Sequence, residues 1–261
     1  MSTIQTGDVY VALGSSFAAG PGIPGRVPGS PRRAGRSTGN YAHLVAERQG
    51  LTLRDATFSG ATTSDILSRR SEDSPAQIDS VDGTTKLVTL TGGGNDIGYL
   101  PGLTLSSLPA VATRLPAVRR RLDRIRDATV TEALITRLER SLDDIVGEIR
   151  MRAPDSTVLL VDYLTILPTD GSISTAPLPS EMADWGRRIA SRLTATTRRV
   201  AERGAAVFVP AGEVSMAHHA WAAIPWTRRF HYSLRGGAAY HPNAAGMAAV
   251  ARMVGEALPE R

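Results

Sequence analysis

The sequence predicts an α/β domain built on a five-stranded parallel β-sheet with helices on both faces. Short apolar runs alternate along the chain with longer stretches of helical character, the pattern of a parallel sheet with helical crossovers. The 261 residues include 42% hydrophobic side chains, enough for one sizeable globular core. No run of about 18 apolar residues occurs, so we expect no membrane span. We therefore expect residues 1–261 to form a single domain.

Five apolar runs have the length and composition of buried strands. They lie at residues 9–13, 51–56, 87–91, 158–161 and 205–209. Helices are expected at residues 41–48, in a stretch after residue 64, within residues 108–150, and at residues 182–203 and 242–258. The stretch of residues 92–157 is unusually long for a single crossover between the third and fourth predicted strands. We expect a helical pair there, lying beside the sheet rather than forming a second domain.

Three long loops stand out between these elements, at about residues 20–40, 163–180 and 211–240. Loops of this length in a compact domain are usually functional or disordered. The third loop is rich in aromatic residues, which either line an apolar acyl pocket or pack the loop onto the core. The substrate-lining candidates are Trp221, Trp226 and Phe230.

Arginine dominates the positive charge of the chain. The net charge is +5 with a pI of about 10.0, and Lys86 is the only lysine. The arginines occur in helical stretches among acidic residues, which is typical of solvated helix faces. No aromatic residues alternate with them, so we expect no nucleic-acid binding. The arginine bias indicates a bacterial source with a GC-rich genome.

Cysteine is absent, which excludes disulfides, thiolate metal sites and a cysteine nucleophile. Histidines and carboxylates do not cluster at metal-binding spacings, so we expect no metal and no organic cofactor. The first eight residues are polar and lack the apolar stretch of a secretory signal. We therefore expect a cytoplasmic protein, and we predict no particular oligomeric state.

A serine after the first strand and a histidine before the last helix carry the main chemical signal. Ser16 follows the first apolar run in a turn of small residues, and His241 precedes Pro242, a residue suited to the first turn of a helix. The positive end of that helix would disfavour imidazolium. A neutral imidazole is what a general base requires, and a serine with a base can perform acyl transfer.

Two further turns follow the second and third predicted strands. The carboxyl ends of parallel strands meet at one edge of a sheet, so we expect Gly60 and Asn95 to lie near Ser16. Glycine lets a backbone N–H approach a ligand closely, and asparagine can donate from its side-chain amide. Together with the Ser16 N–H, these groups would form a three-donor oxyanion hole.

These segments, in this order, resemble the SGNH hydrolase superfamily, also called GDSL esterases and lipases. The matching blocks are Gly14-Ser15-Ser16, then Gly60, then Gly93-Gly94-Asn95-Asp96, and finally His241-Pro242-Asn243 with Gly246. The resemblance spans residue 9 to about residue 250 and implies a flavodoxin-like three-layer α/β/α sandwich. It also implies that Ser16 is the nucleophile, that Gly60 and Asn95 complete the oxyanion hole, and that His241 is the base.

Two positions depart from the family pattern. The family carries an aspartate three residues before the histidine, where this chain has Ala238, and no Asp or Glu occurs between Glu213 and Glu256. Three ways to orient the imidazole stay open, which are a backbone carbonyl, a distant carboxylate, or no partner. Because some members of the family use a main-chain carbonyl, the resemblance implies a Ser–His dyad with a carbonyl from residues 235–239. Ser15 replaces the aspartate that usually precedes the nucleophile. We expect its hydroxyl to brace the turn with a modest loss of activity.

The expected function is hydrolysis of carboxylic esters, of carboxylesterase or lipase type, on small-molecule or lipid-like substrates. The reaction would pass through an acyl-enzyme on Ser16 with His241 as general base. Two alternatives stay open. One is an acyltransferase that passes the same acyl group to an alcohol or amine. The other is an acyl-binding protein whose weakened catalytic groups no longer turn over.

Overall fold

A parallel sheet forms the centre of the computed structural model, which describes residues 3–69, 71, 75–232 and 238–259. The strand order is β2-β1-β3-β4-β5, and all four pairings are parallel. The strands are β1 (Val9–Gly14), β2 (Thr52–Asp55), β3 (Thr85–Thr91), β4 (Thr157–Val161) and β5 (Val207–Val209).

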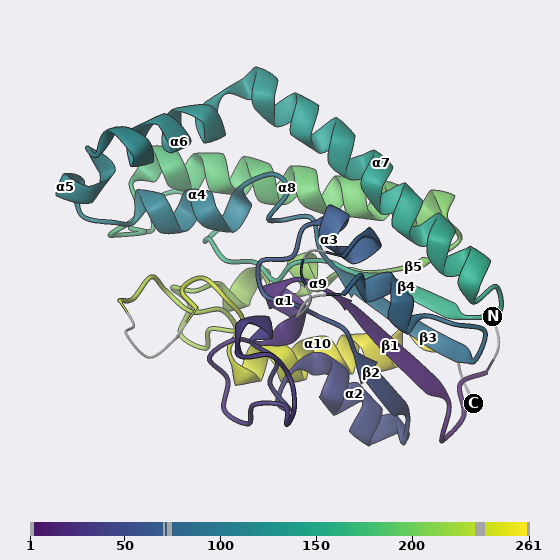
Figure 1. Cartoon of the computed structure of the whole chain (residues 1–261). Helices are drawn as coiled ribbons and strands as arrows, with labels where there is room; N and C mark the ends of the chain where they lie inside the picture. Colours follow the sequence, from purple (N-terminus) through teal and green to yellow (C-terminus); the bar gives the residue numbers. More distant parts are fainter. Residues whose placement is uncertain (1–2, 70, 72–74, 233–237, 260–261) are drawn as a thin grey trace.

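Helices cover both faces of the sheet (Figure 1). One face carries α2 (Tyr41–Gln49) and α10 (Ala244–Glu256), which pack against each other. The other face carries α3 (Thr63–Leu67), α4 (Tyr99–Ser106), α6 (Pro116–Arg126), α7 (Ala128–Arg152) and α8 (Ser180–Arg203). The short helices are α1 (Ser16–Ala19), α5 (Ala110–Thr113) and α9 (Ala211–Val214). This arrangement confirms the predicted flavodoxin-like α/β/α fold.

The predicted strands agree with the structure to within two residues at each end. The two-residue differences are at β3, which begins at Thr85, and at β5, which begins at Val207 because Ala205 adopts a left-handed conformation (φ +50°) after the end of α8. The expected helical pair within residues 108–150 corresponds to α6 and α7. The sequence analysis did not predict α4, which packs against α8.

The last helix begins later than predicted. Its first residue is Ala244, and Asn243 caps it by accepting a hydrogen bond from the Gly246 N–H at 2.9 Å. Asparagine is among the preferred capping residues, so Pro242 lies outside the helix rather than in its first turn. The prediction that Pro242 lies in the first turn of this helix is therefore wrong.

The three predicted loops lie where the sequence placed them, with some local structure. The first contains a 3-10 turn at Arg32–Ala34, and the third contains α9 and a 3-10 turn at Met216–His218. Residues 233–237 of the third loop lie outside the described residues. Among the helices that are described, none is both long and apolar enough to cross a bilayer.

One large cluster of buried apolar side chains extends from Ile4 to Val254 in α10. β1, β3 and β4 are almost completely buried, as expected for the central strands of a parallel sheet with both faces covered. β1 pairs in parallel with both β2 and β3, so the turns that follow these three strands lie at the same edge of the sheet.

Candidate active site

Ser16 is the first residue of α1, directly after the carboxyl end of β1. Gly14 makes the turn with φ +138°, and a Cβ at this position would lie 2.2 Å from the carbonyl oxygen of Thr91 in β3. Only glycine therefore fits here. The buried side chain of Gln77 accepts from the Gly14 N–H at 2.7 Å and donates to its carbonyl at 3.1 Å. These contacts fix the turn that presents the Ser16 hydroxyl.

The hydroxyl of Ser15 braces this turn from the other side. It lies 3.1 Å from the hydroxyl of Tyr163, which also accepts from the Gly94 N–H at 3.1 Å. Burial raises the pKa of Tyr163 to about 12, so its phenol stays protonated and can donate to Ser15. The Tyr163 ring packs 4.4 Å from that of Phe17. Sequence reasoning expected the role of Ser15 but missed Tyr163.

His241 contacts Ser16 directly. Its Nε2 lies 2.7 Å from Ser16 Oγ, and its Nδ1 lies 2.7 Å from the carbonyl oxygen of Ala239. A carbonyl can only accept, so Nδ1 carries the proton and Nε2 is free to accept from the serine hydroxyl. The second contact lies within residues 235–239, where the sequence predicted an orienting carbonyl. No described carboxylate forms a hydrogen bond with this imidazole.

The His241 imidazole is held neutral by its surroundings. Burial lowers its pKa to about 4, with the Ala239 carbonyl opposing the shift and the Arg228 guanidinium adding to it. That guanidinium is fixed by donating to the carbonyls of Pro21 at 3.3 Å and Gly22 at 3.0 Å. Burial is therefore the main cause that keeps the His241 imidazole neutral at pH 7.

The turn that carries His241 is held by the preceding loop. The Arg228 N–H donates to the His241 carbonyl at 2.9 Å, and the Tyr240 N–H donates to the Arg228 carbonyl at 3.1 Å. Tyr240 adopts φ +64°, which costs about 1–2 kcal/mol for a residue other than glycine. Its ring is fully buried and its hydroxyl lies 2.6 Å from Ser107 Oγ, contacts that hold this conformation.

Gly60 and Asn95 line the same cleft as Ser16 and His241. Gly60 has φ +79°, and a Cβ there would meet no other atom within 4 Å, so its backbone borders open space. The Asn95 side chain donates one N–H to the Ala61 carbonyl at 2.9 Å and keeps a second. Within the described chain, no backbone acceptor faces the N–H of Ser16 or Gly60. Three donors are thus available beside the serine hydroxyl.

Asp96 joins the two loops that supply these donors. Its carboxylate accepts from the Thr63 N–H at 3.0 Å and from the Thr63 hydroxyl at 2.6 Å. Together with the contact between Asn95 and Ala61, this ties the loop of Gly60 to the turn of Asn95. Asp96 therefore fixes the position of the Gly60 loop relative to the Asn95 turn.

Comparison with known proteins identifies the family. The family model of GDSL-like lipases and acylhydrolases matches residues 12–249. The chain belongs to this family. It is 31% identical over 248 residues to Lipase 2 of Streptomyces coelicolor, an alignment that covers 91% of this chain and 81% of that protein. The resemblance predicted from the four sequence blocks is confirmed, and the protein is an ester hydrolase.

Solved structures share the fold of this GDSL-like hydrolase. Phospholipase A1 from Streptomyces albidoflavus NA297 has a TM-score of 0.80 at 22% identity, covering 97% of this chain and 100% of that chain. The extracellular lipase of Streptomyces rimosus has a TM-score of 0.75 at 25% identity, covering 96% and 99%. The same architecture therefore extends over nearly the whole hydrolase.

The cleft of the hydrolase has a volume of about 420 Å³. Besides the residues already described, its lining includes side chains of α4 and α6, which are Leu100, Pro101, Thr104, Leu105 and Arg121. This part of the lining is mainly apolar and suits an acyl or alkyl chain. Across the described ranges, no group of three or more His, Asp or Glu side chains is placed to hold a metal ion.

Of the two roles expected for the aromatic loop, its described residues show the packing role. Trp221, Trp226 and Phe230 are not among the described residues that line the cleft, and all three pack against the core. The Trp226 ring stacks on His218 at 3.9 Å, and the Phe230 ring lies 6.2 Å from that of Tyr240. The loop therefore supports the turn of the proposed base, while helices supply the apolar part of the cleft.

Proposed function

We propose that this hydrolase cleaves carboxylic esters through an acyl-enzyme on Ser16, with His241 as general base. The observation that carries the proposal is the 2.7 Å contact between His241 Nε2 and Ser16 Oγ. It is supported by the proton that the Ala239 carbonyl holds on Nδ1. An imidazole in this tautomer and charge state accepts the proton of the attacking hydroxyl.

The proposed reaction has two matched halves. Ser16 Oγ attacks the ester carbonyl carbon while His241 Nε2 takes its proton, and the alcohol then leaves with that proton as the C–O bond breaks. Water next gives a proton to Nε2 and attacks the acyl carbon. The acyl–serine bond breaks, the acid is released, and the proton returns to Ser16.

The donors beside Ser16 would stabilise the negative oxygen that forms in each half. The N–H groups of Ser16 and Gly60 and the free N–H of Asn95 point to one end of the cleft in this proposal. Losing a single donor of this kind typically costs about 3–4 kcal/mol of transition-state stabilisation. This contribution matters more here because the Ala239 carbonyl stabilises the imidazolium less than a carboxylate would.

The proposed substrates are small-molecule or lipid-like esters. The apolar residues Leu100, Pro101 and Leu105 offer a surface for an acyl chain. The relatives include proteins named as lipases and a phospholipase A1, and an acetylxylan esterase from Geobacillus stearothermophilus shares the fold (TM-score 0.57, 16% identity). A cytoplasmic location stays a prediction, which immunoblotting of cell fractions would test.

Hydrolysis of p-nitrophenyl acetate, butyrate and longer esters tests the proposal. We expect turnover that Ser16→Ala abolishes and that Ser64→Ala, on the exposed surface of α3, retains. Added alcohol that accelerates p-nitrophenol release and yields a new ester would instead indicate an acyltransferase. Absence of turnover in a folded protein that still binds these esters would indicate an acyl-binding protein and contradict the proposal.

A further inference from the structure

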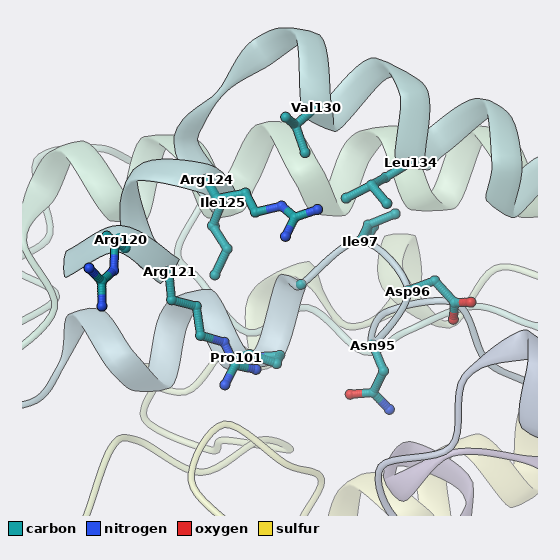
Figure 2. A pocket seen from close by; sticks show the side chains of 11 residues that line it. Asn95, Asp96, Ile97, Pro101, Arg120, Arg121, Arg124, Ile125, Val130 and Leu134 are labelled. Atoms are coloured by element: carbon teal, nitrogen blue, oxygen red, sulfur yellow. The ribbon is translucent and has the colours of Figure 1, made fainter. Parts of the chain in front are cut away.

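A second cavity has a volume of about 490 Å³. Figure 2 shows the side chains that line it. Three residues line both this cavity and the proposed catalytic cleft, namely Asn95, Pro101 and Arg121. Asn95 is one of the proposed donors to the ester oxygen. A substrate whose carbonyl lies against these donors can therefore extend a neighbouring group into the second cavity.

The second cavity is lined by three arginines from α6, Arg120, Arg121 and Arg124. None of the three forms an ion pair or a side-chain hydrogen bond with another described residue. Arg119 and Arg126 of the same helix each pair with an acidic side chain. Among the arginines of α6, the three that line the cavity are thus the ones without an acidic partner in the described part of the chain.

The rest of the lining favours an anion. Figure 2 shows Arg121 and Arg124 extending from α6 into the space, while the Asp96 carboxylate points away from them. Asp96 is the only carboxylate among the described lining residues, and it is occupied by hydrogen bonds to the N–H and hydroxyl of Thr63. Apolar side chains complete the walls, which are Ile97, Ile125, Val130 and Leu134. Low-polarity walls strengthen the attraction between cations and an anion.

We propose that this cavity is a subsite for a phosphate group carried by the ester substrate. The planar guanidinium groups of arginine match phosphate oxygens in paired hydrogen bonds. The inference rests on the proposed function and narrows it to phosphorylated esters, of which glycerophospholipids are the lipid-like kind. The phosphate would lie beyond Asn95, next to Arg120, Arg121 and Arg124, while the acyl carbonyl lies at Ser16.

Two short-chain esters that stay monomeric test this subsite. Dihexanoylphosphatidic acid and dihexanoylglycerol share the same acyl esters and differ by the phosphate. We expect kcat/KM to favour the phosphatidic acid in the wild type, and Arg120→Ala/Arg124→Ala to lower this preference about tenfold, as for two partly exposed ionic contacts. Arg48→Ala/Arg188→Ala removes the same charge from α2 and α8 and is expected to keep the preference.

Changes in ionic strength and the addition of inorganic phosphate provide two further tests of the phosphate subsite. The preference of the wild type is expected to weaken in high salt, because salt screens exposed charges. A preference that is equal in the wild type and in Arg120→Ala/Arg124→Ala would overturn the proposal. If, in addition, inorganic phosphate changed dihexanoylglycerol hydrolysis through these arginines, the cavity would be assigned to a free anion.

Failure of the proposed function would look different from failure of the subsite. In that case neither dihexanoyl ester would be cleaved, or Ser16→Ala would cleave both at the wild-type rate. Loss of the phosphate preference alone, with cleavage of both esters still dependent on Ser16, would contradict only the subsite.

Discussion

Two walls of the proposed cleft are held in place by different interactions. The first, the turn wall, carries Ser16, Gly60, Asn95 and His241. The second, the helix wall, carries Leu100, Pro101, Leu105 and Arg121. Buried and partly buried hydrogen bonds fix the turn wall, whereas packing between α4, α6 and α8 positions the helix wall. We therefore predict that the chemical step depends on the turn wall and that the choice of substrate depends on the helix wall.

If this division is correct, changes in the turn wall lower kcat and changes in the helix wall alter KM. Asn95→Ala removes a side-chain donor from the proposed oxyanion hole, so we expect kcat to fall about 100- to 1,000-fold. KM for p-nitrophenyl butyrate should change little, because the interaction forms mainly in the transition state. A raised KM with an unchanged kcat would place Asn95 with the substrate-binding residues.

Gln77→Leu tests whether buried hydrogen bonds support the turn wall from behind. The substitution removes the acceptor of the buried Gly14 N–H, while the Gly14 carbonyl keeps its hydrogen bond from the Phe58 N–H, so we expect a loss of about 1–3 kcal/mol in the free energy of unfolding. Urea denaturation measures this loss, and kcat should fall in the folded fraction as the Ser16 turn loosens. Gln5→Leu, at an exposed position, should stay within about 0.5 kcal/mol of the wild type.

The pH dependence tests the electrostatics of the turn wall. Only neutral His241 accepts the serine proton, and its pKa is about 4, so kcat/KM should stay level from pH 7 to about 5 and fall as the pH drops through about 4. Arg228→Gln removes a cation that helps to lower this pKa. The acid limb should then move to higher pH. If the acid limb stays at the same pH or moves to lower pH, Arg228 does not lower the pKa of His241.

The smallest effect is expected on the helix wall. Leu105→Ala shortens an apolar side chain that lines the cleft, so we expect KM for p-nitrophenyl butyrate to rise about 2- to 10-fold with kcat nearly unchanged. Leu115→Ala serves as the control, since Leu115 is 55% exposed and is not among the described residues of the cleft. A large fall in kcat for Leu105→Ala would contradict the prediction that the helix wall affects only substrate binding.

The turn wall was predictable because its turns demand particular residues. Gly14 cannot carry a side chain so close to Thr91, and Gly60 combines a positive φ with an open backbone. The central strands are equally easy to recognise in the sequence as apolar runs, because both faces of those strands are buried. Such local requirements restrict the sequence itself, so sequence patterns reveal the fold and the residues that meet in the cleft.

The supports of the turn wall and the identity of the helix wall were not predictable. Tyr163 meets Ser15 across 148 positions, and Gln77 meets Gly14 across 63. Neither residue differs locally from an ordinary buried tyrosine or glutamine. The same holds for Arg121 and its neighbours, because only the fold reveals which arginines of the arginine-rich helix α6 lack an acidic partner. The composition of an aromatic loop is also the same whether the loop binds substrate or packs on the core, so the sequence does not distinguish these two roles.

Covalent labelling tests the central claim most directly. A fluorophosphonate reacts with a serine that is activated by a neighbouring base, and peptide mass spectrometry locates the adduct. We predict a single adduct on Ser16, formed at least about 100-fold more slowly in His241→Ala at pH 7. An adduct on another serine, or equal labelling rates in the wild type and His241→Ala, would contradict the proposed dyad.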